Sequence, residues 1–262
     1  MIDASLATPA PPAVIHREDY RPPAWLVPDI ALDFDLGIER TTVTARLALR
    51  RNGNASGSEP IRLNGDGIQP LTVRLDGTEP TGWAMDGADL VIPCAGDSAA
   101  IEIVTEVNPA ANSQLMGLYA SNAMLCTQCE AEGFRRITFF PDRPDVLSVY
   151  RVRMTGDKAL FPVLLSNGNC VASGEGTQGS HWAEWHDPWP KPSYLFALVA
   201  GDLVANSGTF TTMSGREVTC NIWVRPGDEA RTDHALASLI ASMRWDEEVF
   251  GREYDLDLYN IV

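Results

Sequence analysis

Apolar and polar residues alternate over much of this chain. From Asp29 to about Cys220, short runs in which every second residue is apolar recur between Gly, Pro, Asn and Asp, and this period of two is typical of half-buried β-strands. Thr41 to Arg51 shows the pattern most fully. Similar runs lie at Leu71 to Leu75, Ala100 to Val107, Leu147 to Met154, Lys158 to Leu165, His181 to Trp185 and Tyr194 to Val199. The pattern predicts a mainly β fold in which antiparallel sheets pack on one another as a sandwich.

The period changes near the end of the chain. After Pro226-Gly227-Asp228, apolar residues recur at spacings of three and four up to Phe250, and Gly251 follows. This predicts one amphipathic helix inside Asp228 to Phe250 that ends at Gly251. Residues 255–262 alternate as a strand and finish on apolar side chains. Because natural C-termini are usually polar and frayed, we interpret the sequence as the front part of a longer protein, with an ordinary C-terminal edge strand as the alternative.

Charge and composition narrow the classes of partner and location. A formal net charge of −15 over 262 residues disfavours binding to nucleic acid, which needs clustered Lys and Arg. No run approaches the roughly 18 apolar residues of a membrane-spanning helix, so a soluble protein without a membrane span is predicted. Residues 1–13 are rich in Ala and Pro and lack the basic start of a secretory signal, so we expect a flexible tail and a cytoplasmic location. The five scattered cysteines are expected to stay reduced.

Cysteine, histidine and tryptophan residues supply the first candidates for chemistry. Cys126 and Cys129 have the CxxC spacing of redox pairs and of half a zinc site, but two small half-buried thiols are favoured because no matching ligands accompany them. The four histidines form no HExxH pair, so no zinc site is expected within this chain. Trp182, Trp185 and Trp189 either stack on a sugar or partner surface or fill the core and the rim of the sheet, and the second interpretation is favoured.

A polar group of a different kind consists of Gln128, Glu130 and Glu132. They alternate at i, i+2 and i+4, so an extended backbone presents all three side chains on one face. Two carboxylates and an amide oxygen can surround an ammonium group or hold a hard cation. Spacing alone favours a solvated polar face over either kind of site.

Longer stretches of the sequence carry a family resemblance. They are Gly117-Leu118-Tyr119, Cys126-Thr127-Gln128-Cys129-Glu130-Ala131-Glu132-Gly133-Phe134-Arg135, Pro141-Asp142-Arg143-Pro144-Asp145-Val146 and Asp187-Pro188-Trp189-Pro190-Lys191-Pro192. In these stretches the chain resembles the bacterial aminopeptidase N family, the alanyl aminopeptidases among the gluzincin zinc metallopeptidases. The resemblance implies a saddle-like β-sandwich N-terminal domain over residues 14–201. It also implies that residues 202–262, strands plus one helix, are the truncated beginning of a thermolysin-like catalytic domain.

The same resemblance implies a function. In the family, residues that match Gln128 and Glu130 bind the free α-amine of a peptide substrate, and Glu132 has no such role. The HExxH and GxMEN motifs of the family would lie beyond Val262, so the resemblance implies no catalytic residue and no metal ligand within this chain. It implies a zinc metallo-aminopeptidase as the full-length protein. The chain alone is expected to hold no zinc and to be inactive, with peptide substrates and the rest of its own catalytic domain as partners. A stand-alone β-sandwich binding or interaction module without catalysis is the alternative.

Overall fold

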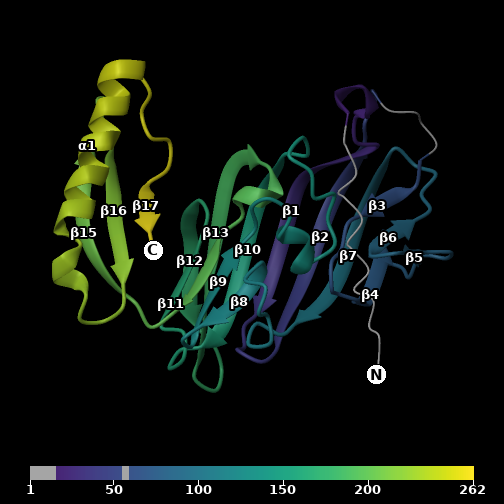
Figure 1. The fold of residues 1–262 in the computed structure, drawn as a ribbon, viewed down its shortest axis with the longest axis horizontal. Coiled ribbons are helices and arrows are strands. Elements are labelled where there is room, and N and C mark those ends of the chain that lie inside the picture. The colour runs from purple at the N-terminus through teal and green to yellow at the C-terminus, as the bar shows by residue number, and fades with distance from the viewer. Residues whose placement is uncertain (1–15, 55–58) are drawn as a thin grey trace, which may run out of the picture.

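The fold is mainly β, as predicted (Figure 1). It comes from a computed structural model that describes residues 16–54 and 59–262, so the predicted tail at 1–13 lies outside the described residues. The strands are β1 (Trp25–Asp35), β2 (Thr41–Arg51), β3 (Ile61–Leu63), β4 (Pro70–Leu75), β5 (Ala84–Asp86), β6 (Asp89–Ile92), β7 (Ser98–Val107), β8 (Gly117–Ser121), β9 (Met124–Gln128), β10 (Ser148–Asp157), β11 (Val163–Ser166), β12 (Asn169–Glu175), β13 (Ser180–Lys191), β14 (Leu198–Gly201), β15 (Val204–Thr211), β16 (Glu217–Val224) and β17 (Leu258–Ile261). The helices are α1 (Asp233–Phe250) and the short 3-10 turns η1 (Arg17–Asp19), η2 (Phe134–Arg136), η3 (Ser193–Leu195) and η4 (Glu229–Arg231).

A seven-stranded sheet in the order β12-β13-β10-β1-β2-β7-β4 forms the body of the molecule. Strand β2 has the predicted bounds, and Val43, Ala45 and Leu47 are buried while the residues between them are half-buried or exposed. The sheet therefore has one face in the core and one toward solvent. Strands β1 and β10 pair in parallel, which departs from the all-antiparallel prediction, because alternation specifies the buried face of a strand and not its direction.

Three smaller sheets complete the fold. The orders are β11-β14-β9-β8, β15-β16-β17 and β3-β6-β5. Figure 1 shows the β3-β6-β5 sheet at one end of a curved row and β15-β16-β17 with α1 at the other. Strand β17, in the predicted final strand, pairs with β16 in parallel.

Two of the predicted strands are shorter than expected. Residues 158–161 turn instead of extending, because the Asp157 carboxylate accepts the Ala159 N–H at 2.8 Å and the Asp157 carbonyl accepts the Phe161 N–H at 2.8 Å. Between η3 and β14, the side chain of Asn167 donates to the Leu195 carbonyl and accepts from the Ala197 N–H. In both places a polar side chain satisfies backbone groups that a strand ladder would otherwise pair.

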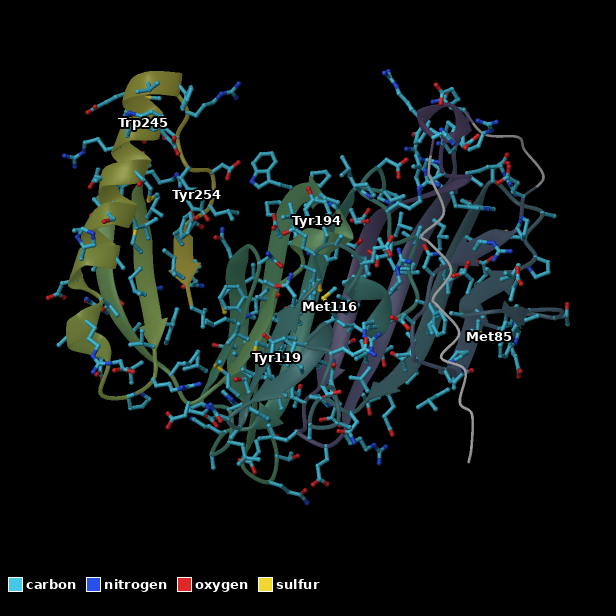
Figure 2. All side chains as sticks on the ribbon, in the orientation of Figure 1. Met85, Met116, Tyr119, Tyr194, Trp245 and Tyr254 are labelled. Carbon is cyan, nitrogen blue, oxygen red and sulfur yellow. The ribbon has the colours of Figure 1, made fainter. Side chains whose placement is uncertain are left out.

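Helix α1 lies inside the predicted window and ends where predicted. Gly251 adopts the left-handed conformation with φ of 61°, and its N–H donates to the Glu247 carbonyl, which is the usual C-terminal cap. One side of the helix packs on β15 and β16 through Leu239 and Met243. Its far end leaves three large apolar side chains more than half exposed: Trp245, Val249 and Phe250. Figure 2 marks Trp245 on this helix.

The buried apolar side chains form two clusters. The larger runs from Trp25 to Ala200 and joins the seven-stranded, four-stranded and β3-β6-β5 sheets. The smaller lies between α1 and the β15-β16-β17 sheet. Trp223 and Leu258 of the second part pack against the larger cluster, and the Asn169 side chain exchanges two hydrogen bonds with Asp257. Within the described residues, α1 is too polar to cross a membrane and no other helix is long enough.

Candidate functional site

The candidate amine-binding residues lie at the end of the β8–β9 hairpin, near the middle of the molecule, where Figure 2 marks Met116 and Tyr119. Gln128 is the last residue of β9 and Glu130 follows it, and both are exposed while Cys129 between them is buried. The peptide bond between Glu130 and Ala131 is cis. The chain then turns back, because the Gly133 N–H donates to the Cys129 carbonyl at 2.7 Å.

This turn separates the three polar residues that alternate in the sequence. The Gln128 amide nitrogen donates to the Glu130 carbonyl at 3.0 Å, and its side-chain oxygen accepts no hydrogen bond from the residues that the structure describes. Glu132 pairs with Arg135 at 3.3 Å. Within residues 16–54 and 59–262, by contrast, the Glu130 carboxylate takes part in no hydrogen bond or ion pair. Gln128 and Glu130 are therefore linked by a hydrogen bond and remain available as acceptors, whereas the Glu132 carboxylate pairs with Arg135.

Close backbone packing holds this turn. A Cβ on Gly133 would lie 2.2 Å from the Gln128 carbonyl oxygen, and one on Gly117 would lie 2.8 Å from the Arg136 Cβ. Gly117 also has a positive φ of 75°, which favours glycine. Phe134, just after the turn, is fully buried and packs edge-on against Phe140, Tyr150 and Phe196. Buried Cys129 thus lies between the two exposed acceptors, and buried Phe134 follows the turn.

The surroundings of the CxxC cysteines disfavour the thiolate form that redox chemistry needs. All five cysteines are free. Burial raises the pKa of the Cys129 thiol far above its ordinary value and raises that of the half-buried Cys126 as well, so both thiols are protonated and poor nucleophiles at neutral pH.

The described residues do not fit a zinc ion. In the described part of the chain, no three His, Cys, Asp or Glu side chains gather as metal ligands. The His181 ring binds the Phe161 carbonyl instead.

The three tryptophans lie in different settings. Trp185 is buried and donates to the Leu164 carbonyl at 3.1 Å, as the core interpretation predicts. Trp182 stacks under the Arg153 guanidinium, 4.0 Å from the ring centre, and Trp189 is half exposed. They do not form one binding surface.

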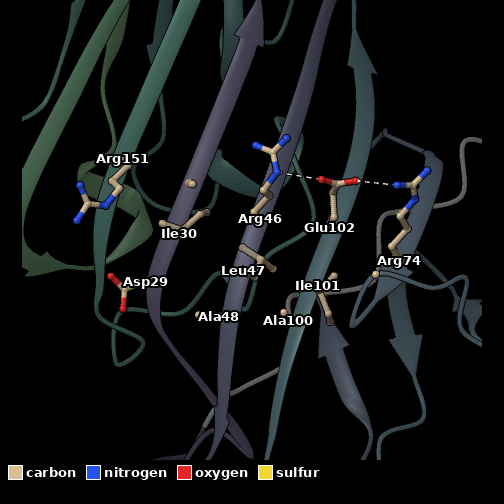
Figure 3. A pocket seen from close by; sticks show the side chains of 12 residues that line it. Asp29, Ile30, Arg46, Leu47, Ala48, Arg74, Ala100, Ile101, Glu102 and Arg151 are labelled. Atoms are coloured by element: carbon tan, nitrogen blue, oxygen red, sulfur yellow. Dashed lines mark hydrogen bonds and ion pairs between the residues drawn. The ribbon is translucent and has the colours of Figure 1, made fainter. Parts of the chain in front are cut away.

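A separate hollow of about 460 Å³ lies on the open face of the seven-stranded sheet (Figure 3). Its charged side chains are largely paired with each other, since Arg46 and Arg74 both contact Glu102. Gln128 and Glu130 do not line this hollow. Both residues are exposed at the surface.

Comparison with known proteins identifies the family that part of this chain matches. Residues 94–195 match the Peptidase M1 N-terminal domain. These residues belong to that family. The chain is 51% identical over 254 residues to aminopeptidase N of Caulobacter vibrioides and 48% identical over 251 residues to that of Escherichia coli. It covers 29% of the length of each relative, and each match covers 96% of this chain.

Two solved structures share the fold of this chain. Legionella pneumophila aminopeptidase A, in complex with aspartic acid, aligns over 93% of this chain and 29% of its own with a TM-score of 0.88 and 31% identity. A variant M1 zinc metallopeptidase of Deinococcus radiodurans, bound to a Tyr-Ser-Ala substrate, aligns over 90% of this chain and 56% of its own with a TM-score of 0.74. At 16% identity, the second likeness concerns the fold alone.

Sequence reasoning missed one feature of this M1 domain. Asp142, Arg135 and Ser193 meet in a buried polar cluster behind the turn. Asp142 and Ser193 are 51 positions apart, so no local spacing brings them together. The sequence around Asp142, Pro141-Asp142-Arg143-Pro144, gives no sign of a contact with Ser193.

Proposed function

We propose that this chain is the N-terminal part of a zinc aminopeptidase and that Gln128 and Glu130 bind the free α-amine of a peptide substrate. The observation that carries the proposal is the exposed Glu130 carboxylate, which lacks a partner within the described residues, in a residue whose backbone carbonyl accepts a hydrogen bond from the Gln128 side chain. An ammonium group is the complementary ligand, because it offers three charge-assisted donors to such acceptors. The 48–51% identity to aminopeptidases N supports this assignment.

The proposed role is positional. An amine held at Glu130 fixes the distance from the peptide's N-terminus to its first peptide bond, and this restricts cleavage to that bond. We propose that residues 202–262 begin the catalytic domain and that the remainder of that domain faces Gln128 and Glu130. We also propose that zinc is held in that remainder rather than by this chain. The separate apolar cluster of α1 and β15–β17 supports the boundary. The five free cysteines support a reducing, cytoplasmic location.

The alternative, a stand-alone binding module, gains no specific support, because the three tryptophans proposed for it do not share a surface. A chimera decides between the two functions. In it, this chain replaces the matching region of the Caulobacter aminopeptidase N, to which it is 51% identical. We expect the chimera to release N-terminal residues from peptides.

The decisive variant is Glu130→Ala in that chimera. Removing the carboxylate leaves the substrate ammonium without its charged partner and costs about 2 to 5 kcal/mol of binding free energy. The value of kcat/KM should therefore fall by roughly 30-fold to several-thousand-fold. Gln128→Ala removes a neutral acceptor, about 1 kcal/mol or fivefold. Glu132→Ala is the matched control, because that exposed carboxylate pairs with Arg135 and should change kcat/KM by no more than about threefold. Equal effects of Glu130→Ala and Glu132→Ala would refute the amine-binding role.

A further inference from the structure

The Asp142 carboxylate is a charge buried in the body of the protein. Its side chain is 1% exposed, and Arg135 at 2.9 Å is its ion-pair partner. A buried carboxylate is costly unless its oxygens receive several hydrogen bonds. Both oxygens are used here: Oδ2 accepts from the Arg135 backbone N–H at 3.2 Å and from its Nε, and Oδ1 accepts from the Ser193 hydroxyl.

These contacts converge on the segment that carries the candidate amine-binding residues. Arg135 comes two residues after Gly133, whose N–H closes the turn on Cys129. The Arg135 guanidinium also donates to the Asp142 carbonyl at 2.8 Å and pairs with Glu132 on the exposed side of the turn. Asp142 therefore holds the exit of the turn through both the backbone and the side chain of one residue.

The same carboxylate reaches two other parts of the fold. Ser193 belongs to η3, which leads into β14, and β14 pairs with β9, the strand that ends at Gln128. On the other side, the Asp142 N–H donates to the Asn64 side chain at 3.1 Å, and Asn64 bridges to Phe140 through two backbone hydrogen bonds. The entry and the exit of the turn are thus tied to one buried group.

We propose that Asp142 is a positioning residue, which holds the Gln128–Glu130 turn in place through Arg135 and Ser193 without touching the ligand. The proposal rests on the proposed amine-binding function. Its physical basis is that a charge-assisted network in a low-dielectric interior is rigid, because any displacement leaves a buried charge unpaired. A displacement of about 1 Å in a group that orients a substrate lowers the rate of reaction by roughly 100-fold.

Amide hydrogen exchange in the 262-residue chain tests whether Asp142 anchors the Gln128–Glu130 turn, and it needs no catalytic activity. We call this role of Asp142 the anchor. The Arg135 N–H donates directly to the Asp142 carboxylate, so it is the reporter, together with the Gly133 N–H. Asp142→Ala is expected to speed exchange at both amides by about tenfold or more, while amides of β2 and β7 keep their protection. Asp145→Ala is the matched control, because Asp145 is also paired with an arginine, Arg143, and lies outside the turn. Unchanged exchange at Arg135 and Gly133 would overturn the proposal.

Activity in the chimera tests the consequence for substrate. With Glu130 present, Asp142→Ala should lower kcat/KM for a free-amine peptide by about 10- to 100-fold. In the Glu130→Ala background the same change should cost no more than about threefold, because the group that it positions is gone. A merely structural role would lower kcat/KM equally in both backgrounds, and that result would also overturn the proposal.

Milder variants keep the test decisive where Asp142→Ala does not fold. Asp142→Asn retains the size and one acceptor oxygen, and Ser193→Ala removes only the bond to Oδ1. Both are expected to speed exchange at Arg135 and Gly133 by smaller factors of at least about twofold. If exchange at these two amides is unchanged in both variants, the positioning role of Asp142 is refuted. If exchange rises but Glu130→Ala leaves kcat/KM unchanged, the anchor stands and the amine-binding function fails.

Discussion

Gly133 is a position where even a methyl group is expected to destabilise the fold. An added Cβ lies 2.2 Å from the Gln128 carbonyl oxygen, 2.9 Å from the Cys129 Cα and 2.9 Å from the Gly117 nitrogen. All three are backbone atoms of the turn and of β8, so no side-chain rotation relieves the contact. The Gly133 backbone itself, with φ of −81° and ψ of −19°, suits any residue. The steric clash alone opposes alanine here.

The size of the effect follows from two opposing contributions. Forcing one extra carbon into a well-packed site costs about 1 to 3 kcal/mol, and three contacts below 3.0 Å place Gly133→Ala toward the upper end. Alanine also restricts the unfolded chain, which returns about 0.4 to 1 kcal/mol. The net loss is about 2 kcal/mol, which corresponds to roughly 4 to 8 °C in the midpoint of thermal unfolding for a protein of this size.

Thermal unfolding followed by circular dichroism measures this loss in the 262-residue chain, independently of any enzymatic activity. Gly53→Ala is the matched control, since a Cβ there meets no atom within 4 Å and no positive φ is involved. It should leave the midpoint unchanged or raise it slightly. If Gly133→Ala unfolds at the same temperature as Gly53→Ala, the close packing of the turn inferred from the structure is wrong.

Two further predictions concern pH and metal. The hydrogen bond from Arg143 holds the pKa of Asp145 below its ordinary value of 3.8, so this carboxylate stabilises the fold above about pH 4, and that stability is lost as the pH falls through the lowered pKa. Asp145→Asn should flatten this part of the dependence of the urea unfolding free energy on pH, and an unchanged slope would contradict it. The chain alone should hold no stoichiometric zinc and cleave no aminoacyl substrate; one tightly bound zinc per chain by metal analysis would disprove this.

The sequence pattern predicted an element correctly where the residues of that element alone determine which of its side chains are buried. Strand β2 alternates strictly and lies where its pattern places it, and α1 ends at Gly251 because only a left-handed residue closes that turn. The same local reasoning failed where a distant side chain decides the backbone. Asn167 takes the hydrogen bonds of Leu195 and Ala197, about thirty positions away, and nothing in a window around Tyr194 indicates this.

In the candidate site, too, some features follow from the local sequence and others depend on distant residues. Alternation around Cys129 correctly placed Gln128 and Glu130 at the surface, since a buried residue between two polar ones is a local feature. Alternation could not separate Glu130 from Glu132, which look equivalent in an extended segment. The turn after Cys129 separates them, and it depends on Gly133 fitting against β8 and on Arg135 finding Asp142.

That dependence explains why an exposed turn is built on so much buried structure. A side chain that orients a substrate needs its position defined to a fraction of an ångström, and an exposed loop held only by water contacts does not supply this. Here buried Cys129 lies between the two exposed acceptors and buried Phe134 follows them, so the freedom of the turn is limited by the packing of the core. If Glu130 binds an amine, its precision is set by residues that never touch the ligand. Substitutions in the core behind the turn should therefore alter amine recognition before they abolish folding.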